Sequence, residues 1–84
     1  MDQANLLEVF IVTPREILFE GKAHSVVLPG EMGIFEVMIN HKPLFTRLLA
    51  GEVIVDEERS IPIRRGVAKV MSNRILAVVE GVSQ

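Results

Sequence analysis

Residues that form turns divide this chain into short segments, and that pattern limits the folds open to it. Glycine, proline and asparagine recur from Pro14 onward, and the segments between them are about four to eight residues long and rich in Val, Ile and Leu. These segments span residues 6–13, 16–19, 22–28, 34–39, 52–56, 61–65, 67–71 and 74–79. Strands at this spacing indicate an all-β sandwich or barrel.

The connections between these segments favour antiparallel neighbours. Ser72-Asn73 lies between two apolar segments and predicts a tight hairpin turn. The polar residues 57–60 predict a longer, solvated hairpin tip. Residues 43–49 are too few for an isolated helix, so we expect a strand or a turn there. Two small sheets that pack with their apolar faces inward make the simplest architecture.

The composition favours one small domain and excludes several classes of protein. The 84 residues predict a single domain over residues 1–84, and the hydrophobic content of 49% leaves room for an apolar contact surface. Lys and Arg are scattered and the net charge is −2, so there is no basic stripe to bind nucleic acid. We expect neither a signal peptide at residues 1–5 nor a membrane span, which needs roughly 20 apolar residues.

The chain lacks the side chains that most enzymes bring together. It has no cysteine, and His24 and His41 are 17 positions apart, which is not a spacing typical of metal ligands. A metal site that combines a histidine with Glu31 or Glu36 is disfavoured, and we expect His24 to be an outward-facing strand residue. The sequence therefore predicts no catalytic residue, no metal and no cofactor.

The Pro-Gly pair at 29–30 predicts a turn with two exposed residues beside it. Gly30-Glu31-Met32-Gly33 resembles a phosphate loop only in its glycines, because no helix follows. Pro29 before Gly30 favours a type II turn with Gly30 at its third position. Glu31 and Met32 would then lie at an exposed tip, where binding residues are common.

Several loop motifs occur in a characteristic order. They are Val-Thr-Pro-Arg-Glu at 12–16, Phe-Glu-Gly at 19–21, Leu-Pro-Gly-Glu-Met-Gly-Ile at 28–34, Asn-His-Lys-Pro-Leu-Phe-Thr at 40–46 and Leu-Leu-Ala-Gly at 48–51. Over about residues 6–80 this order resembles the N-terminal β-sandwich domain of the epsilon subunit of F-type rotary ATP synthases. The resemblance implies a flattened sandwich of about ten short, mostly antiparallel strands. The helical hairpin that follows in that family has no counterpart here, so its inhibitory and ATP-binding properties are not expected.

The resemblance also implies a function and assigns residues to it. The epsilon domain is a non-catalytic rotor subunit that joins the gamma subunit to the membrane c-ring and couples ion flow, of protons or sodium, to ATP synthesis. Glu31 and Met32 match its c-ring side, and Thr13, His41 and Thr46 match its gamma side. The chain would then lie on the cytoplasmic face of the membrane, peripheral to it within the complex.

One departure from the family pattern affects the His41 loop. Residues 33–41 exceed the commoner family spacing by about two or three residues, although short family members with a Phe-Glu-Val/Ile-Met run fit. The histidine also has a plainer interpretation, in which its ring only satisfies the backbone of its own loop.

Two other functions remain open at this stage. One is a generic β-sandwich adaptor that binds some other protein. The other is a small ligand-binding or isomerase-like barrel with His41 and Glu36 as acid and base. The odd spacing between these two residues puts them on opposite sides of a regular strand and argues against that enzyme.

Overall fold

The computed structural model describes residues 5–82, which form eight β-strands. The strands are β1 (Leu7–Val12), β2 (Ile17–Ala23), β3 (Ser25–Gly30), β4 (Gly33–Met38), β5 (Leu44–Leu48), β6 (Gly51–Val55), β7 (Arg59–Met71) and β8 (Arg74–Gly81). Residues 1–4 and 83–84 lie outside the described residues, and the expectation for residues 1–5 falls almost wholly outside them.

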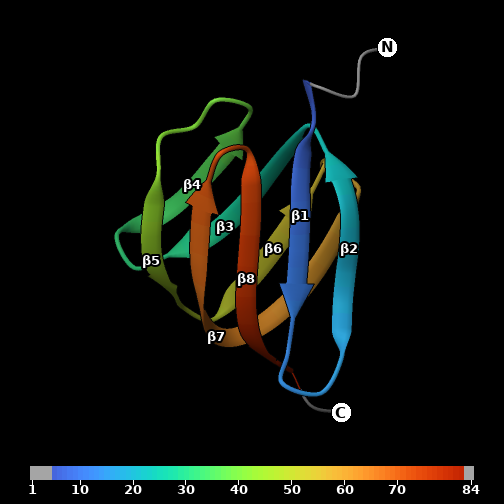
Figure 1. The fold of residues 1–84 in the computed structure, drawn as a ribbon. Coiled ribbons are helices and arrows are strands. Elements are labelled where there is room, and N and C mark those ends of the chain that lie inside the picture. The colour runs from blue at the N-terminus through green and yellow to red at the C-terminus, as the bar shows by residue number, and fades with distance from the viewer. Residues whose placement is uncertain (1–4, 83–84) are drawn as a thin grey trace.

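The strands form one continuous ladder that folds over into two layers. Its order is β2-β1-β8-β7-β5-β3-β4, and β6 pairs with β3 and β7. In Figure 1, β2, β1, β8, β7 and β5 lie side by side in front, while β3, β4 and β6 cross behind them. The principal extents of 38 × 24 × 21 Å describe an elongated body. The predicted all-β sandwich is confirmed, with eight strands in place of about ten.

Most neighbouring strands are antiparallel, as predicted, but β1 and β8 run parallel. The turn at Ser72-Asn73 is a tight hairpin with φ values of 53° and 62°, both in the left-handed region that such turns require. Residues 43–49 contribute β5, so the prediction of a strand or turn there is confirmed.

The long strand β7 differs from the prediction of two separate strands. It runs for 13 residues through Gly66, and its pairing with β8 shifts in register between Ile63 and Arg65. Gly66 is needed for close packing, because a Cβ there would lie 2.5 Å from the Val78 carbonyl oxygen. β7 bends at this region, so its first half pairs with β6 and its second half with β5.

The boundary between β2 and β3 also differs from the prediction. β2 continues through Gly21, and the break falls at His24, which is exposed between two strands. The Asp56 carboxylate accepts hydrogen bonds from the backbone N–H of His24 at 2.7 Å and of Ser25 at 3.1 Å. Since Asp56 belongs to the β6–β7 turn, this contact fixes the corner between β2 and β3 to the opposite hairpin.

The type II turn predicted at Pro29-Gly30 is wrong. Both residues lie within β3, Gly30 pairs with Gly33, and the turn residues are Glu31 and Met32. Gly33, not Gly30, has the positive φ, at 126°. A proline is tolerated in this strand because Pro29 occupies a position where its missing N–H is not needed for pairing with β4. The predicted exposure of Glu31 and Met32 is confirmed.

The core is built by strand alternation in both layers. In β8 the inward side chains are Ile75, Ala77 and Val79, and each is at most 3% exposed. The other buried apolar side chains are Leu7, Val9, Ile11, Ala23, Val26, Leu28, Val37, Leu48, Val53, Val55, Ile61, Ile63, Ala68 and Val70. Aliphatic side chains from both layers therefore fill the space between them.

Candidate partner-binding surfaces

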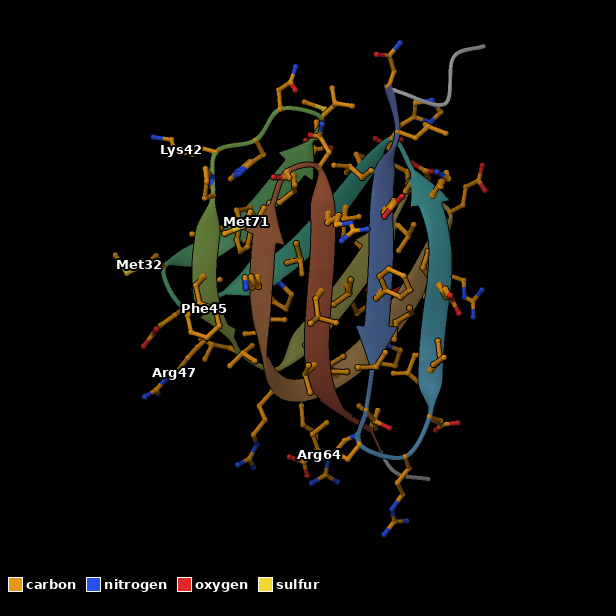
Figure 2. The ribbon with its side chains drawn as sticks, in the orientation of Figure 1. Met32, Lys42, Phe45, Arg47, Arg64 and Met71 are labelled. Carbon is orange, nitrogen blue, oxygen red and sulfur yellow. The ribbon has the colours of Figure 1, made fainter. Side chains whose placement is uncertain are left out.

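The β3–β4 turn presents Glu31 and Met32 at one end of the molecule. Met32 is 97% exposed and projects away from the body beside β5 (Figure 2). The backbone N–H of Glu31 donates to the Arg47 carbonyl at 3.1 Å, which ties the turn to β5. Within residues 5–82, Glu31 has no ion-pair partner. The turn is thus a supported tip with an available carboxylate and an exposed apolar side chain.

His41 lies in the loop between β4 and β5 and contacts its own backbone. The backbone N–H of His41 donates to the Met38 carbonyl at 3.2 Å, and the ring Nδ1 lies 2.7 Å from the Lys42 carbonyl oxygen. Because a carbonyl only accepts, Nδ1 carries the proton in this contact and Nε2 of the neutral ring is left as an acceptor. Asn40, with φ of 66°, donates its N–H to the Asn73 side chain at 2.6 Å. The loop is therefore held to the β7–β8 turn.

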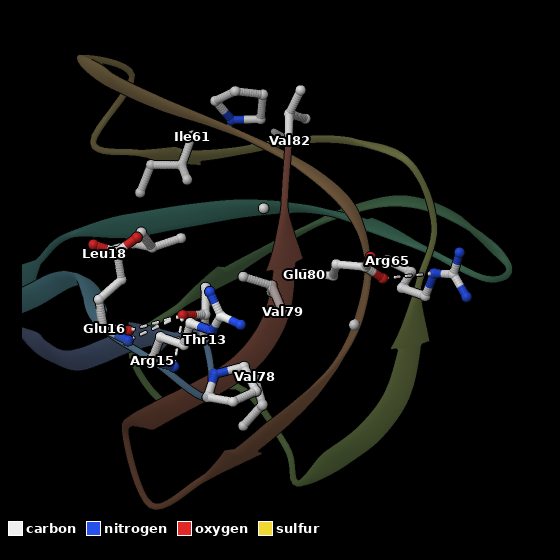
Figure 3. A pocket seen from close by; sticks show the side chains of 14 residues that line it. Thr13, Arg15, Glu16, Leu18, Ile61, Arg65, Val78, Val79, Glu80 and Val82 are labelled. Atoms are coloured by element: carbon white, nitrogen blue, oxygen red, sulfur yellow. Dashed lines mark hydrogen bonds and ion pairs between the residues drawn. The ribbon is translucent and has the colours of Figure 1, made fainter. Parts of the chain in front are cut away.

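Thr13 follows β1 and its hydroxyl is occupied within the β1–β2 turn. The hydroxyl oxygen accepts from the backbone N–H of Arg15 at 3.1 Å and of Glu16 at 3.0 Å (Figure 3). The backbone N–H of Thr13 donates to the Glu16 carbonyl at 2.8 Å. Such a turn is a local side-chain motif of threonine, so Thr13 shapes this end of the sandwich through its backbone contacts.

Thr46 lies on β5 on the same side as the core-facing Leu48. Its hydroxyl donates to the Arg47 carbonyl at 3.2 Å and is half-buried. Its two neighbours, Phe45 and Arg47, point outward, and Phe45 is 73% exposed. A partner that covers the outer side of β5 would therefore contact Phe45 and Arg47 more directly than Thr46.

Phe45 belongs to an apolar surface that spans the front layer. Strand pairing places Phe45 beside Lys69, Lys69 beside Leu76, and Leu76 beside Phe10. Leu76 is 44% exposed and Phe10 is 36% exposed. A neighbouring row runs from Arg47 through Val67 and Val78 to Val12. We call this surface the front face, defined by Phe10, Phe45, Val67, Met71, Leu76 and Val78.

Charged residues lie within and beside the front face and differ in whether they are already paired. Glu8 forms ion pairs with Arg74 at 3.0 Å and Lys22 at 3.8 Å. By contrast, Lys69 and Arg47 have no ion-pair partner among residues 5–82. Two available cations beside exposed aromatic and aliphatic side chains favour a protein partner with apolar and acidic groups.

The front face was missed in the sequence, although a signal for it exists. Val67, Met71, Leu76 and Val78 occupy outward positions where a solvated face would carry polar residues. The apolar segments 67–71 and 74–79 therefore carry apolar side chains on both faces. Strands with apolar side chains on both faces are typical of sheets that are covered on both sides.

An open groove lies at the end of the sandwich near Thr13 (Figure 3). Its volume is about 810 Å³, and its lining includes Arg15, Leu18, Ile61 and Val79. Arg65 and Glu80 also line it, and they form an ion pair with each other at 3.1 Å. The lining offers apolar contacts and paired charges, without a cluster of convergent acid and base groups.

Residues 5–82 lack two other kinds of feature. No group of three or more His, Asp or Glu side chains is placed to hold a metal ion in that part of the chain. No helix there is long and apolar enough to span a bilayer.

A small β-sandwich with exposed turns and a broad apolar face is typical of a subunit that binds other proteins. Residues 6–83 match the family described as the ATP synthase delta/epsilon chain β-sandwich domain. The chain belongs to this family. The assignment agrees with the loop motifs, so the predicted resemblance to the epsilon subunit is confirmed.

Curated relatives support the same family. An ATP synthase epsilon chain of Sulfurimonas denitrificans is 38% identical over 79 residues, which cover 89% of this chain and 61% of that protein. One from Chlorobium limicola is 36% identical over 77 residues, which cover 87% of this chain and 88% of that protein. The chain thus spans less than two thirds of the first relative and most of the second.

Solved structures share the fold. One chain of a Tetrahymena thermophila mitochondrial ATP synthase central stalk and c-ring structure has a TM-score of 0.74 at 13% identity, covering 88% of this chain and 63% of that chain. One chain of a Euglena gracilis mitochondrial ATP synthase structure has a TM-score of 0.78 at 16% identity, covering 98% of this chain and 56% of that chain.

Proposed function

We propose that this chain is a non-catalytic central-stalk subunit of an F-type ATP synthase, which joins the gamma subunit to the c-ring and couples ion flow to ATP synthesis. The observation that carries the proposal is the presence of two separate exposed surfaces on one body. The front face covers one layer of the sandwich, and the Glu31–Met32 tip extends from the β3–β4 hairpin.

The gamma subunit is the partner proposed for the front face. The three residues matched to the gamma side all lie around that layer: Thr13 follows β1, Thr46 lies on β5 and His41 precedes it. The front face lies between these positions and offers Phe45 and Leu76 as exposed apolar anchors. Aromatic side chains at the centre of an interface commonly contribute most of its binding energy.

The c-ring is the partner proposed for the Glu31–Met32 tip. The carboxylate of Glu31 is available, since it has no ion-pair partner among the described residues. A cation on a polar loop of the ring would complement it, and Met32 would contact apolar parts of the same loop. The hydrogen bond from Glu31 to Arg47 connects this tip to β5, which also carries Phe45 of the front face.

The fold suits a part that must transmit torque between two partners. Ladder hydrogen bonds connect every strand to a neighbour, and β7 runs through both layers. The contact from Asp56 to the β2–β3 corner adds a link between distant turns. A load applied at the tip would therefore pass to the front face through a body with little freedom to deform.

An affinity-tagged copy of the chain, expressed in its own organism, tests this function. Purification from detergent-solubilised membranes should recover the gamma subunit and the c subunit in stoichiometric amounts, as measured by mass spectrometry. Recovery of an unrelated protein without gamma would contradict the proposal and favour the adaptor function.

The variant Glu31→Lys is expected to weaken assembly with the c-ring about tenfold, because charge reversal replaces attraction by repulsion at an exposed contact. The fraction of variant chain that co-purifies with the c subunit measures this effect, together with ATP-driven ion pumping by membrane vesicles. Glu58→Lys is the matched control, since Glu58 is an exposed glutamate on the β6–β7 turn. Equal assembly of the two variants would reject the role given to Glu31.

A further inference from the structure

Strand β4 has a free edge. It stands at the end of the strand order and pairs only with β3. A strand edge presents backbone N–H and C=O groups that can pair with another chain, and soluble proteins usually cover or charge such edges. The free edge of β4 is therefore a candidate site for strand addition.

The position of Pro29 shows which backbone groups of β4 are available. Pro29 lies opposite Ile34, and it has no N–H to exchange with that residue. In an antiparallel ladder, hydrogen-bonded and non-hydrogen-bonded pairs alternate. Phe35 and Val37 therefore bond to β3, whereas the N–H and C=O groups of Ile34 and Glu36 point toward the free edge.

The side chains of the same residues are exposed. Ile34 is 78% exposed and Met38 is 54% exposed, while Glu36 between them also faces outward. The carboxylate of Glu36 has no ion-pair partner within residues 5–82. The β4 edge thus combines free backbone groups with two apolar side chains and one available anion.

The other edge strand is protected in a way that β4 is not. On β2, the guanidinium of Arg59 donates to the Leu18 carbonyl at 3.4 Å and lies 5.8 Å from the centre of the Phe19 ring. No proline, lysine or arginine lies on β4 itself. The β2 edge thus carries a covering contact from Arg59 and a basic residue, Lys22, whereas among the described residues no such contact covers the β4 edge.

We propose that the free edge of β4 binds an extended segment of the gamma subunit as an added β-strand, with a basic residue of that segment opposite Glu36. This inference rests on the function proposed above. It assigns to gamma a main-chain contact in addition to the front face. Strand addition of this kind takes its affinity from backbone hydrogen bonds and its specificity from alternate side chains.

The charge of Glu36 argues against a second copy of this chain as the occupant. If two β4 strands paired about a two-fold axis, the free N–H and C=O groups of Ile34 and Glu36 in one copy would have to pair with free backbone groups of the other copy. In those registers Glu36 lies opposite Met32, Ile34, Met38 or the partner copy's own Glu36. None of these supplies a cation, so a different protein with a basic residue fits better.

The position of β4 relative to the gamma-side loop supports gamma as the source of the strand. The strand ends at Met38, whose carbonyl accepts the N–H of His41 at 3.2 Å. His41 is one of the residues matched to the gamma side. A segment that follows the edge of β4 would therefore reach the His41 loop without crossing the body of the sandwich.

Hydrogen exchange of individual amides, followed by NMR on the labelled chain with and without the gamma subunit of the same genome, tests the inference. In the free chain, the amides of Ile34 and Glu36 should exchange rapidly and those of Phe35 and Val37 slowly. On binding gamma, exchange at Ile34 and Glu36 should slow at least about tenfold, because new hydrogen bonds protect them.

Each contrary outcome has a distinct meaning. A complex with gamma in which Ile34 and Glu36 remain unprotected would overturn strand addition and leave the central-stalk function standing. Absence of any complex would overturn both. Protection that grows with the concentration of the free chain would identify a second copy as the occupant and reject the proposal.

A charge variant provides an independent measurement. Glu36→Lys should weaken gamma binding about tenfold, since it places a cation against the basic residue of the added strand. Glu52→Lys is the matched control, because Glu52 is an exposed glutamate on β6, in the same layer but away from the free edge. Equal affinities for the two variants would reject the proposed cation opposite Glu36.

Discussion

The variant Phe45→Asp is expected to bind the gamma subunit at least about 30-fold more weakly than the unchanged chain. Loss of an aromatic anchor from an interface can cost about 2 kcal/mol or more, which corresponds to that factor in affinity. Phe45 is 73% exposed in the isolated chain, so the substitution should leave its unfolding temperature almost unchanged. Isothermal titration with purified gamma measures the dissociation constant, and circular dichroism confirms that the variant is folded.

Met32→Asp is the control that separates the two proposed surfaces. Met32 is 97% exposed but lies at the Glu31–Met32 tip, away from the front face, so its replacement should change the affinity for gamma less than about twofold. If Phe45→Asp bound gamma as well as the unchanged chain does, the front face would not be the gamma interface. If both variants lost binding equally, the division into two surfaces would be wrong.

Gly66→Ala is expected to lower the free energy of unfolding by about 2–3 kcal/mol, because a methyl group has no room at this position. A Cβ atom would lie 2.5 Å from the Val78 carbonyl oxygen and 2.9 Å from the Val79 Cα, and both are backbone atoms that cannot move alone. Relieving the clash requires β7 and β8 to separate where β7 bends between the layers. Urea unfolding followed by circular dichroism measures the loss.

Gly81→Ala is the matched control for that prediction. Gly81 also lies in a strand, yet nothing stands within 4 Å of the Cβ position. Its substitution should change stability by less than about 0.5 kcal/mol, as is usual for surface changes. A similar loss in both variants would mean that the cost comes from removing a glycine from a strand and not from the close approach at Gly66.

Sequence patterns predicted the parts of the fold that local chemistry determines. A short segment rich in Val, Ile and Leu at 74–79, bounded by turn residues, identified β8. Ser72-Asn73 predicted its hairpin because few other residue pairs adopt two left-handed conformations. The prediction of two strands separated at Gly66 was wrong, because the sequence does not distinguish a glycine in a turn from a glycine that lets two strands pack closely. Pro29-Gly30 misled for the same reason, since the turn depends on Gly33 and on pairing across the hairpin.

The partner surfaces were only partly accessible from the sequence. Exposure of Glu31 and Met32 followed from their place between two glycines, and the structure confirms it. The front face depends on the registers that align Phe45 with Leu76 and Phe10, which involve strands distant in the sequence. The free edge of β4 depends on the strand order, which no local pattern reveals.

Sedimentation or size-exclusion chromatography of the purified chain with the gamma subunit from the same genome tests the central claim most directly. A stable one-to-one complex is predicted, and His41→Ala should bind gamma more weakly because His41 belongs to the proposed gamma side. Failure of a well-folded chain to bind folded gamma would contradict the central-stalk function, although the β-sandwich fold would be unaffected.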